Sequence, residues 1–80
     1  MIKIMIVDDH RLVRAGLRRF LMDVPDMEII AEACTGEQAL EYARVKSPHV
    51  ILMDINMPGI GGLESTRRIK LRQPEVKVIV

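Results

Sequence analysis

The sequence predicts an α/β fold in which helices cover both faces of a parallel sheet. Short apolar runs alternate along the chain with segments of helical periodicity, in the order βαβαβαβ. Because the links between these segments are short, the strands should pair in parallel through right-handed crossovers. Two of the apolar runs end at aspartates, Asp8-Asp9 and Asp54, so carboxylates should lie at the carboxyl edge of the sheet, where such folds place their chemistry.

Length and composition describe one small domain. The chain has 80 residues, of which 49% are apolar and 29% charged, with a net charge of +1. This balance gives no support for binding to nucleic acid or to a membrane surface. The single cysteine, Cys34, excludes an internal disulfide and favours a reducing compartment. No apolar run approaches the roughly 20 residues of a membrane span, and no signal-peptide pattern is present, so a cytoplasmic location is expected.

The first strand is predicted over residues 2–7 and the first helix over about residues 10–24. The strand is a β-branched apolar run, typical of burial on both faces. In the helix, apolar residues recur at i, i+4, i+7, i+8 and i+11, which predicts a face packed on the sheet. That face comprises Val13, Leu17, Phe20, Leu21 and Val24. Arg11, Arg14 and Arg18 lie largely off it and are interpreted as a solvated surface.

The second strand, residues 28–33, contains two glutamates, which suits an edge position. A capping box follows, with the Thr35 hydroxyl as N-cap and the Gln38 side chain reaching back. The second helix should end near Ser47-Pro48. The third strand is the apolar run that ends at Asp54.

The last two elements are a third helix after Gly61-Gly62, ending before Gln73-Pro74, and a fourth strand over residues 76–80. If the first strand lies between the second and the third, the strand order is 2-1-3-4, the flavodoxin-like arrangement. Neighbouring strands are about 4.8 Å apart, so Asp8, Asp9 and Asp54 should share one pocket.

Three crowded carboxylates predict a site for a hard divalent cation, and Mg2+ prefers such oxygen ligands. The carbonyl of Asn56 could supply a further oxygen, whereas no His or Cys spacing suits zinc or copper. His10 is interpreted as a surface residue. With Mg2+ bound, Asp54 could act as a nucleophile toward phosphorus. Taken alone, each aspartate could equally be a turn or capping residue.

At this point the residues resemble the receiver domain of two-component response regulators. The stretch from Met5 to His10 resembles the acidic pair after the first strand of that family. The stretch from Leu52 to Gly62 resembles its phospho-acceptor strand and loop, and Thr35 to Ala39 resembles the start of its second helix. The likeness covers the whole chain and is closest to NarL/FixJ-type regulators of the GacA/UvrY group. It implies a CheY-like doubly wound fold.

The resemblance also implies roles for individual residues. Asp54 would accept a phosphoryl group from the phosphohistidine of a sensor histidine kinase or phosphotransfer domain. Asp9 and Asp54 would ligate Mg2+ through their side chains, Asn56 through its carbonyl, and Asp8 through water.

A kinase-docking surface is a further hypothesis, placed on the first helix beside its core face. The four residues that would form it are Leu12, Ala15, Gly16 and Arg19.

The chain departs from the family where it stops. By the resemblance, residues 1–80 are the N-terminal two thirds of a receiver domain, without the fifth strand, the last two helices, the switch Ser/Thr and the active-site Lys. A helix-turn-helix domain that binds DNA is expected in the full-length protein. The apolar edge of the fourth strand would be open, which invites dimerisation or strand exchange.

Two alternatives to a phospho-accepting signalling module remain open. One is a Mg2+-dependent phosphatase or phosphotransferase with an aspartyl nucleophile, resembling the haloacid dehalogenases. Those enzymes need a second Asp two residues after the nucleophile, but Asn56 follows Asp54 and His10 follows Asp8 at that spacing, which disfavours a turnover enzyme. The other is an interaction module that does not depend on phosphorylation.

Overall fold

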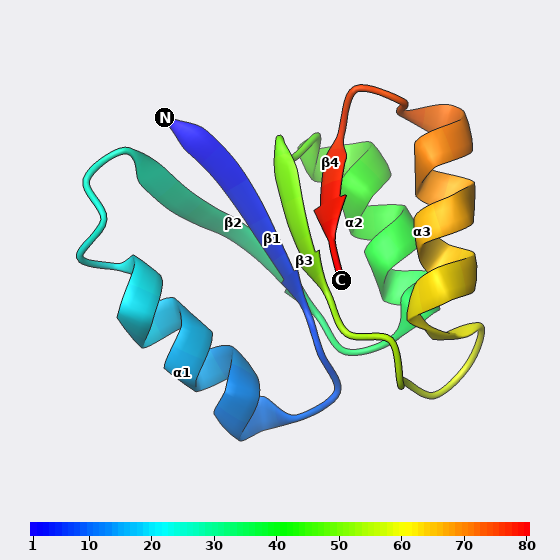
Figure 1. Cartoon of the computed structure of the whole chain (residues 1–80), viewed down its shortest axis with the longest axis horizontal. Helices are drawn as coiled ribbons and strands as arrows, with labels where there is room; N and C mark the ends of the chain where they lie inside the picture. The colour runs from blue at the N-terminus through cyan, green and yellow to red at the C-terminus, as the bar shows by residue number, and fades with distance from the viewer.

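The computed structural model describes residues 1–80 as four strands and three helices in strict alternation (Figure 1). The elements are β1 (Ile2–Val7), α1 (Arg11–Leu21), β2 (Met27–Ala33), α2 (Gly36–Lys46), β3 (Val50–Met53), α3 (Gly61–Arg72) and β4 (Lys77–Ile79). The strands form one parallel sheet in the order β2-β1-β3-β4. This confirms the predicted fold class, the strand order and the edge position of β2. No helix is long and apolar enough to cross a lipid bilayer.

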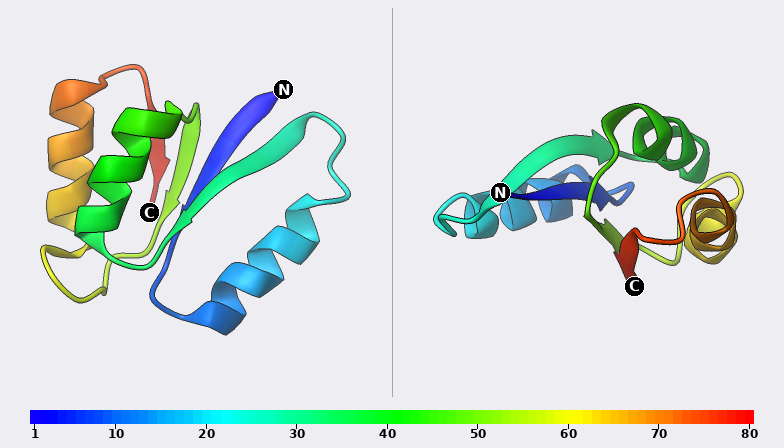
Figure 2. Two further views of the ribbon diagram at one scale, coloured as in Figure 1. Left: turned by 180° about the vertical axis from the view of Figure 1, so that it is seen from behind. Right: turned by 90° about the horizontal axis from the view of Figure 1, so that it is seen from above.

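The two faces of the sheet are covered unequally. Figure 2 shows α1 on one side and α2 with α3 on the other. The main core lies on the side of α2 and α3, and it consists of Met5, Val7, Ala33, Ala39, Ala43, Ile51, Met53, Ile69 and Val76. Because side chains alternate along a strand, Ile4 and Ile6 of β1 point to the α1 side, where they too are buried.

Helix α1 is shorter than predicted, and only part of its predicted face lies toward the sheet. It buries no residue completely, and Phe20, predicted to face the core, is 77% exposed. The less exposed positions are Arg14, Leu17 and Leu21. The predicted face is therefore confirmed at Leu17 and Leu21 and wrong at Phe20. The interpretation of the arginines as solvated is wrong for Arg14, whose side chain is 18% exposed. The physical reason for the burial of Arg14 is its ion pair with Glu32 on β2, a carboxylate that also pairs with the half-exposed Arg18.

The start of α2 follows the predicted capping box with one change. The Thr35 hydroxyl accepts a hydrogen bond from the backbone N–H of Gln38 at 3.1 Å, as predicted. The Gln38 side chain does reach back, but its Oε1 accepts from the backbone N–H of Cys34 at 2.9 Å, one residue before the N-cap. The loop into α2 is thereby fixed at two successive residues.

Candidate functional site

The acidic site is built from the ends of two neighbouring strands. Val7 of β1 and Met53 of β3 are paired in the ladder, so the residues that follow them emerge side by side. Beyond the strands, the backbone N–H of Asp54 donates to the carbonyl oxygen of Val7 at 2.9 Å. The N–H of Asp8 donates to the carbonyl oxygen of Ala33 at 3.0 Å. Three strands therefore fix the backbone from which the carboxylates project.

The three aspartates predicted to share a pocket do come together. Ligand atoms of Asp8, Asp9, His10 and Asp54 all lie within 4.8 Å of one another. The side chains of Asp8 and Asp9 are 13% and 29% exposed and that of His10 is 67% exposed, so the cluster is accessible from solvent. Carboxylate oxygens at this spacing can hold a metal ion.

His10 belongs to this cluster, which sequence reasoning missed. Its Nδ1 lies 2.9 Å from Oδ1 of Asp8 and 3.0 Å from Oδ1 of Asp9. The hydrogen bond to Asp8, followed by the charge of Asp9, raises the pKa of His10 above its ordinary value of 6.5. The sequence did contain an indication of this contact, because His10 follows Asp8 and Asp9 directly and so must lie near both carboxylates.

The loop after β3 is compact. The N–H of Asn56 points to Oδ1 of Asp54 at 3.4 Å, and the N–H of Gly62 donates to the carbonyl of Ile55 at 2.9 Å. Gly59 and Gly61 have positive φ angles of 80° and 77°, which glycine adopts without strain. Helix α3 therefore begins at Gly61, directly after this short loop. The metal-ligand role of the Asn56 carbonyl stays a prediction.

The four residues of the hypothetical docking surface are all exposed. They are Leu12, Ala15, Gly16 and Arg19. The leucine is 86% exposed, and apart from the helix's own backbone and the adjacent residues no atom lies within 4 Å of the place where a Cβ would stand on Gly16. This face of α1 is exposed in the structure, and its role stays a prediction.

A cavity of about 330 Å3 adjoins the acidic cluster on the α1 side of the sheet. Its lining consists of Val7, Asp8, Leu17, Leu52, Met53, Asp54, Ile79 and Val80. Two of these residues are aspartates of the cluster, and the others are apolar. The open apolar edge of the fourth strand is predicted by the sequence, but the cavity is not, because its lining comes from separate elements that meet only in the fold.

Comparison with known proteins assigns this fold and site to a class. Residues 4–80 match the family model of the response regulator receiver domain, and the chain belongs to that family. It is 50% identical over 80 residues to the response regulator GacA of Pseudomonas aeruginosa, and 49% identical over 80 residues to UvrY of Escherichia coli K12. All of this chain is covered, but it spans only 37% of the length of either relative.

Solved structures agree with this membership. A LuxR-family response regulator from Aurantimonas sp. SI85-9A1 superposes with a TM-score of 0.90 at 37% identity, covering 95% of this chain and 54% of that one. RcsB from Salmonella enterica serovar Typhimurium, solved bound to promoter rprA with a phosphomimetic, gives a TM-score of 0.92 at 25% identity, covering 100% and 68%. The chain is therefore similar to regulators of the GacA/UvrY type, as its motifs indicated.

Proposed function

We propose that this chain accepts a phosphoryl group on Asp54 from the phosphohistidine of a sensor histidine kinase or phosphotransfer domain. The observation that carries the proposal is the convergence of Asp8, Asp9 and Asp54 at adjacent strand ends of a receiver fold. An oxygen of Asp54 would form a bond to phosphorus while the bond from phosphorus to the donor nitrogen breaks and that nitrogen keeps the bonding electrons. A donor ring that carries a proton on its other nitrogen would then leave as neutral imidazole. The chain would itself be the phosphorylated product and would serve as a signalling switch. It would not be an enzyme that turns over a substrate.

The donor set fits Mg2+. Asp9 and Asp54 would bind it through their side chains, Asp8 through water and Asn56 through its carbonyl. Bound there, Mg2+ would offset the negative charge of the carboxylates and of the incoming phosphoryl group. The backbone hydrogen bonds from Asp54 to Val7 and from Asp8 to Ala33 would hold the chain from which the carboxylates project during transfer.

The proposal extends to a longer protein. The residues would form the first two thirds of a receiver domain that controls a C-terminal helix-turn-helix domain, and DNA would be bound only by that domain. Two facts support this: the GacA and UvrY relatives are much longer than this chain, and RcsB was solved on a promoter. A histidine kinase partner and an unpaired Cys34 suit a cytoplasmic location.

Two surfaces would serve partners. The exposed face of α1 that contains Leu12 and Gly16 would dock the phosphohistidine domain. Strand β4 pairs with β3 on one side, and its other edge is unpaired. At the end of this strand, Ile79 and Val80 are 53% and 57% exposed. This edge would allow dimerisation or strand exchange between copies.

One experiment separates the proposal from its alternatives. The chain is incubated with Mg2+ and acetyl phosphate, and its intact mass is followed beside Asp54→Asn and a control, Asp23→Asn, which changes an exposed Asp outside the site. We expect addition of one phosphoryl group in the native chain and in the control, and none in Asp54→Asn or without Mg2+. Continuous release of phosphate from an ester substrate would instead favour the phosphatase, and no modification would favour the interaction module.

A further inference from the structure

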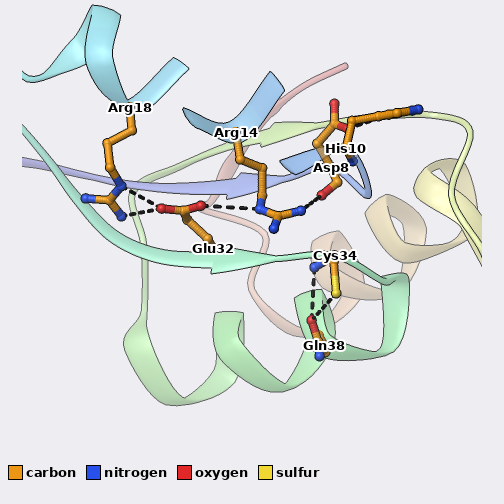
Figure 3. Close-up of polar contacts among 7 residues, drawn as sticks. All are labelled: Asp8, His10, Arg14, Arg18, Glu32, Cys34 and Gln38. Carbon is orange, nitrogen blue, oxygen red and sulfur yellow. Dashed lines mark hydrogen bonds and ion pairs between the residues drawn. The ribbon is translucent and has the colours of Figure 1, made fainter. Parts of the chain in front are cut away.

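Arg14 connects three elements of the fold around the acidic cluster. It projects from α1 with a side chain that is only 18% exposed. Its Nη1 donates a hydrogen bond to the carbonyl oxygen of Asp8 at 2.6 Å, and its Nε donates to Oε1 of Glu32 on β2 at 3.3 Å. Figure 3 shows the guanidinium between these two acceptors. One side chain therefore ties the helix, the edge strand and the loop after β1 together.

The carbonyl that Arg14 contacts belongs to the peptide bond between Asp8 and Asp9. A peptide unit is planar and rigid, so fixing its carbonyl oxygen also fixes the direction in which the chain continues to Asp9. A hydrogen bond from a charged donor is shorter and stronger than one between neutral groups. The contact therefore sets the orientation of the residue proposed to bind Mg2+ directly.

Glu32 holds the guanidinium in this position. Its other oxygen accepts a hydrogen bond from Nε of Arg18 at 2.6 Å, so the carboxylate is shared by two arginines one turn apart on α1. Arg18 itself is half exposed and makes no contact with Asp8 in the structure. The two arginines thus share Glu32 but differ in whether they reach the acidic loop, which provides a matched control.

We propose that Arg14 is a positioning residue for the acidic cluster, acting through the Asp8–Asp9 peptide and steadied by Glu32. Through it, the affinity of the cluster for a divalent cation depends on the hydrogen bond from Arg14 to the carbonyl oxygen of Asp8. This inference rests on the proposed Mg2+ site. Partners that orient metal ligands from outside the coordination sphere typically change metal affinity by about 10- to 100-fold when they are removed.

The test is a titration with Mg2+ of the native chain, Arg14→Met, Arg14→Lys and Arg18→Met, followed through the backbone amide NMR signals of Asp9 and Asp54. Arg14→Met should weaken Mg2+ binding by about tenfold, although the loss of a positive charge near the cluster acts in the opposite direction. Arg14→Lys keeps the positive charge but cannot donate to Glu32 and Asp8 with the planar geometry of a guanidinium. Its Mg2+ affinity should lie between those of Arg14→Met and the native chain. Arg18→Met should bind Mg2+ like the native chain. The amide signal of Asp9 should also shift in Arg14→Met before any metal is added.

Urea unfolding of the same variants separates positioning from general stability. If Arg14→Met lowers the unfolding midpoint but binds Mg2+ as tightly as the native chain, Arg14 is only structural and the inference is overturned. If Arg18→Met weakens binding equally, the effect comes from Glu32 and not from the contact to Asp8, which also overturns it. Absence of Mg2+ binding in the native chain would overturn the proposed metal site as well, so the two failures are distinguishable.

Discussion

Gly62 in the first turn of α3 lies directly against the carbonyl group of Asp54. A Cβ atom on Gly62 would collide with that carbonyl and with the start of Ile55. The backbone of the helix and the backbone after the proposed phospho-acceptor are thus in contact with no room for a side chain. This contact fixes where Asp54 leaves the sheet.

Gly62→Ala should therefore destabilise the fold by about 1–3 kcal/mol, the usual cost of forcing an extra carbon into a packed site. Gly16→Ala is the control, because open space surrounds that glycine in the middle of α1. There, alanine should raise stability by about 1 kcal/mol through its better helix propensity. Urea unfolding followed by circular dichroism measures both. Equal midpoints for the two variants would contradict the contact described above.

The pH dependence of His10 follows from its two carboxylate neighbours. Because the folded chain raises the pKa of His10 above 6.5, its interactions stabilise the fold fully below the unfolded pKa. That contribution is lost as the pH rises through the folded pKa. NMR titration of the His10 ring should give a pKa above 6.5. Asp8→Asn should lower that pKa more than Asp9→Asn, since the bond to Asp8 is the larger cause. A ring that titrates at 6.5 in all three chains would refute this.

Glu64 should show the opposite dependence. Hydrogen bonds from Arg67 and then Arg68 lower the pKa of this carboxyl from 4.5 to about 2. Its contribution to stability is present above the unfolded pKa near 4.5 and disappears as the pH falls toward 2. Because the group is at the surface, added salt should screen the interaction. Carboxyl NMR titration should find the lowered value, rising in Arg67→Met. A pKa of Glu64 that is insensitive to that substitution would show that the ion pair does not persist in solution.

The hypothesis that the exposed face of α1 docks the kinase can be tested by substituting two exposed leucines. Leu12→Asp should slow phosphotransfer from the cognate kinase by roughly tenfold, the effect of removing a contact worth more than 1 kcal/mol. Leu71→Asp is the control, because Leu71 is 71% exposed but lies on α3. Its transfer rate should equal that of the native chain. If Leu12→Asp left the rate unchanged, the docking hypothesis should be dropped.

Much of the fold could be predicted from local patterns. The apolar runs and their separation by helical segments define a parallel sheet, and the polar second strand correctly indicates an edge. The meeting of Asp8 and Asp54 follows from strand order alone. These features follow from the burial of apolar residues and from the alternation of strands with helices, and both are visible in the sequence.

The features that were missed depend on partners distant in the chain. The apolar spacing places Leu17 and Leu21 on the correct side of α1. It could not show that Arg14 also lies toward the sheet, because its partner Glu32 is on another element. The same holds for the contact of Arg14 with Asp8 and for the cavity beside the cluster. A periodicity argument counts apolar residues and takes no account of ion pairs across elements.

The central claim is that Asp54 is the residue that carries the phosphoryl group. After treatment with acetyl phosphate and Mg2+, reduction with borohydride should convert an acyl phosphate into homoserine, and peptide mass spectrometry should place that homoserine at position 54 alone. Asp8→Asn and Asp9→Asn should lower its yield, since both side chains belong to the same cluster. Homoserine at another aspartate, or equal yield with and without Mg2+, would contradict the account.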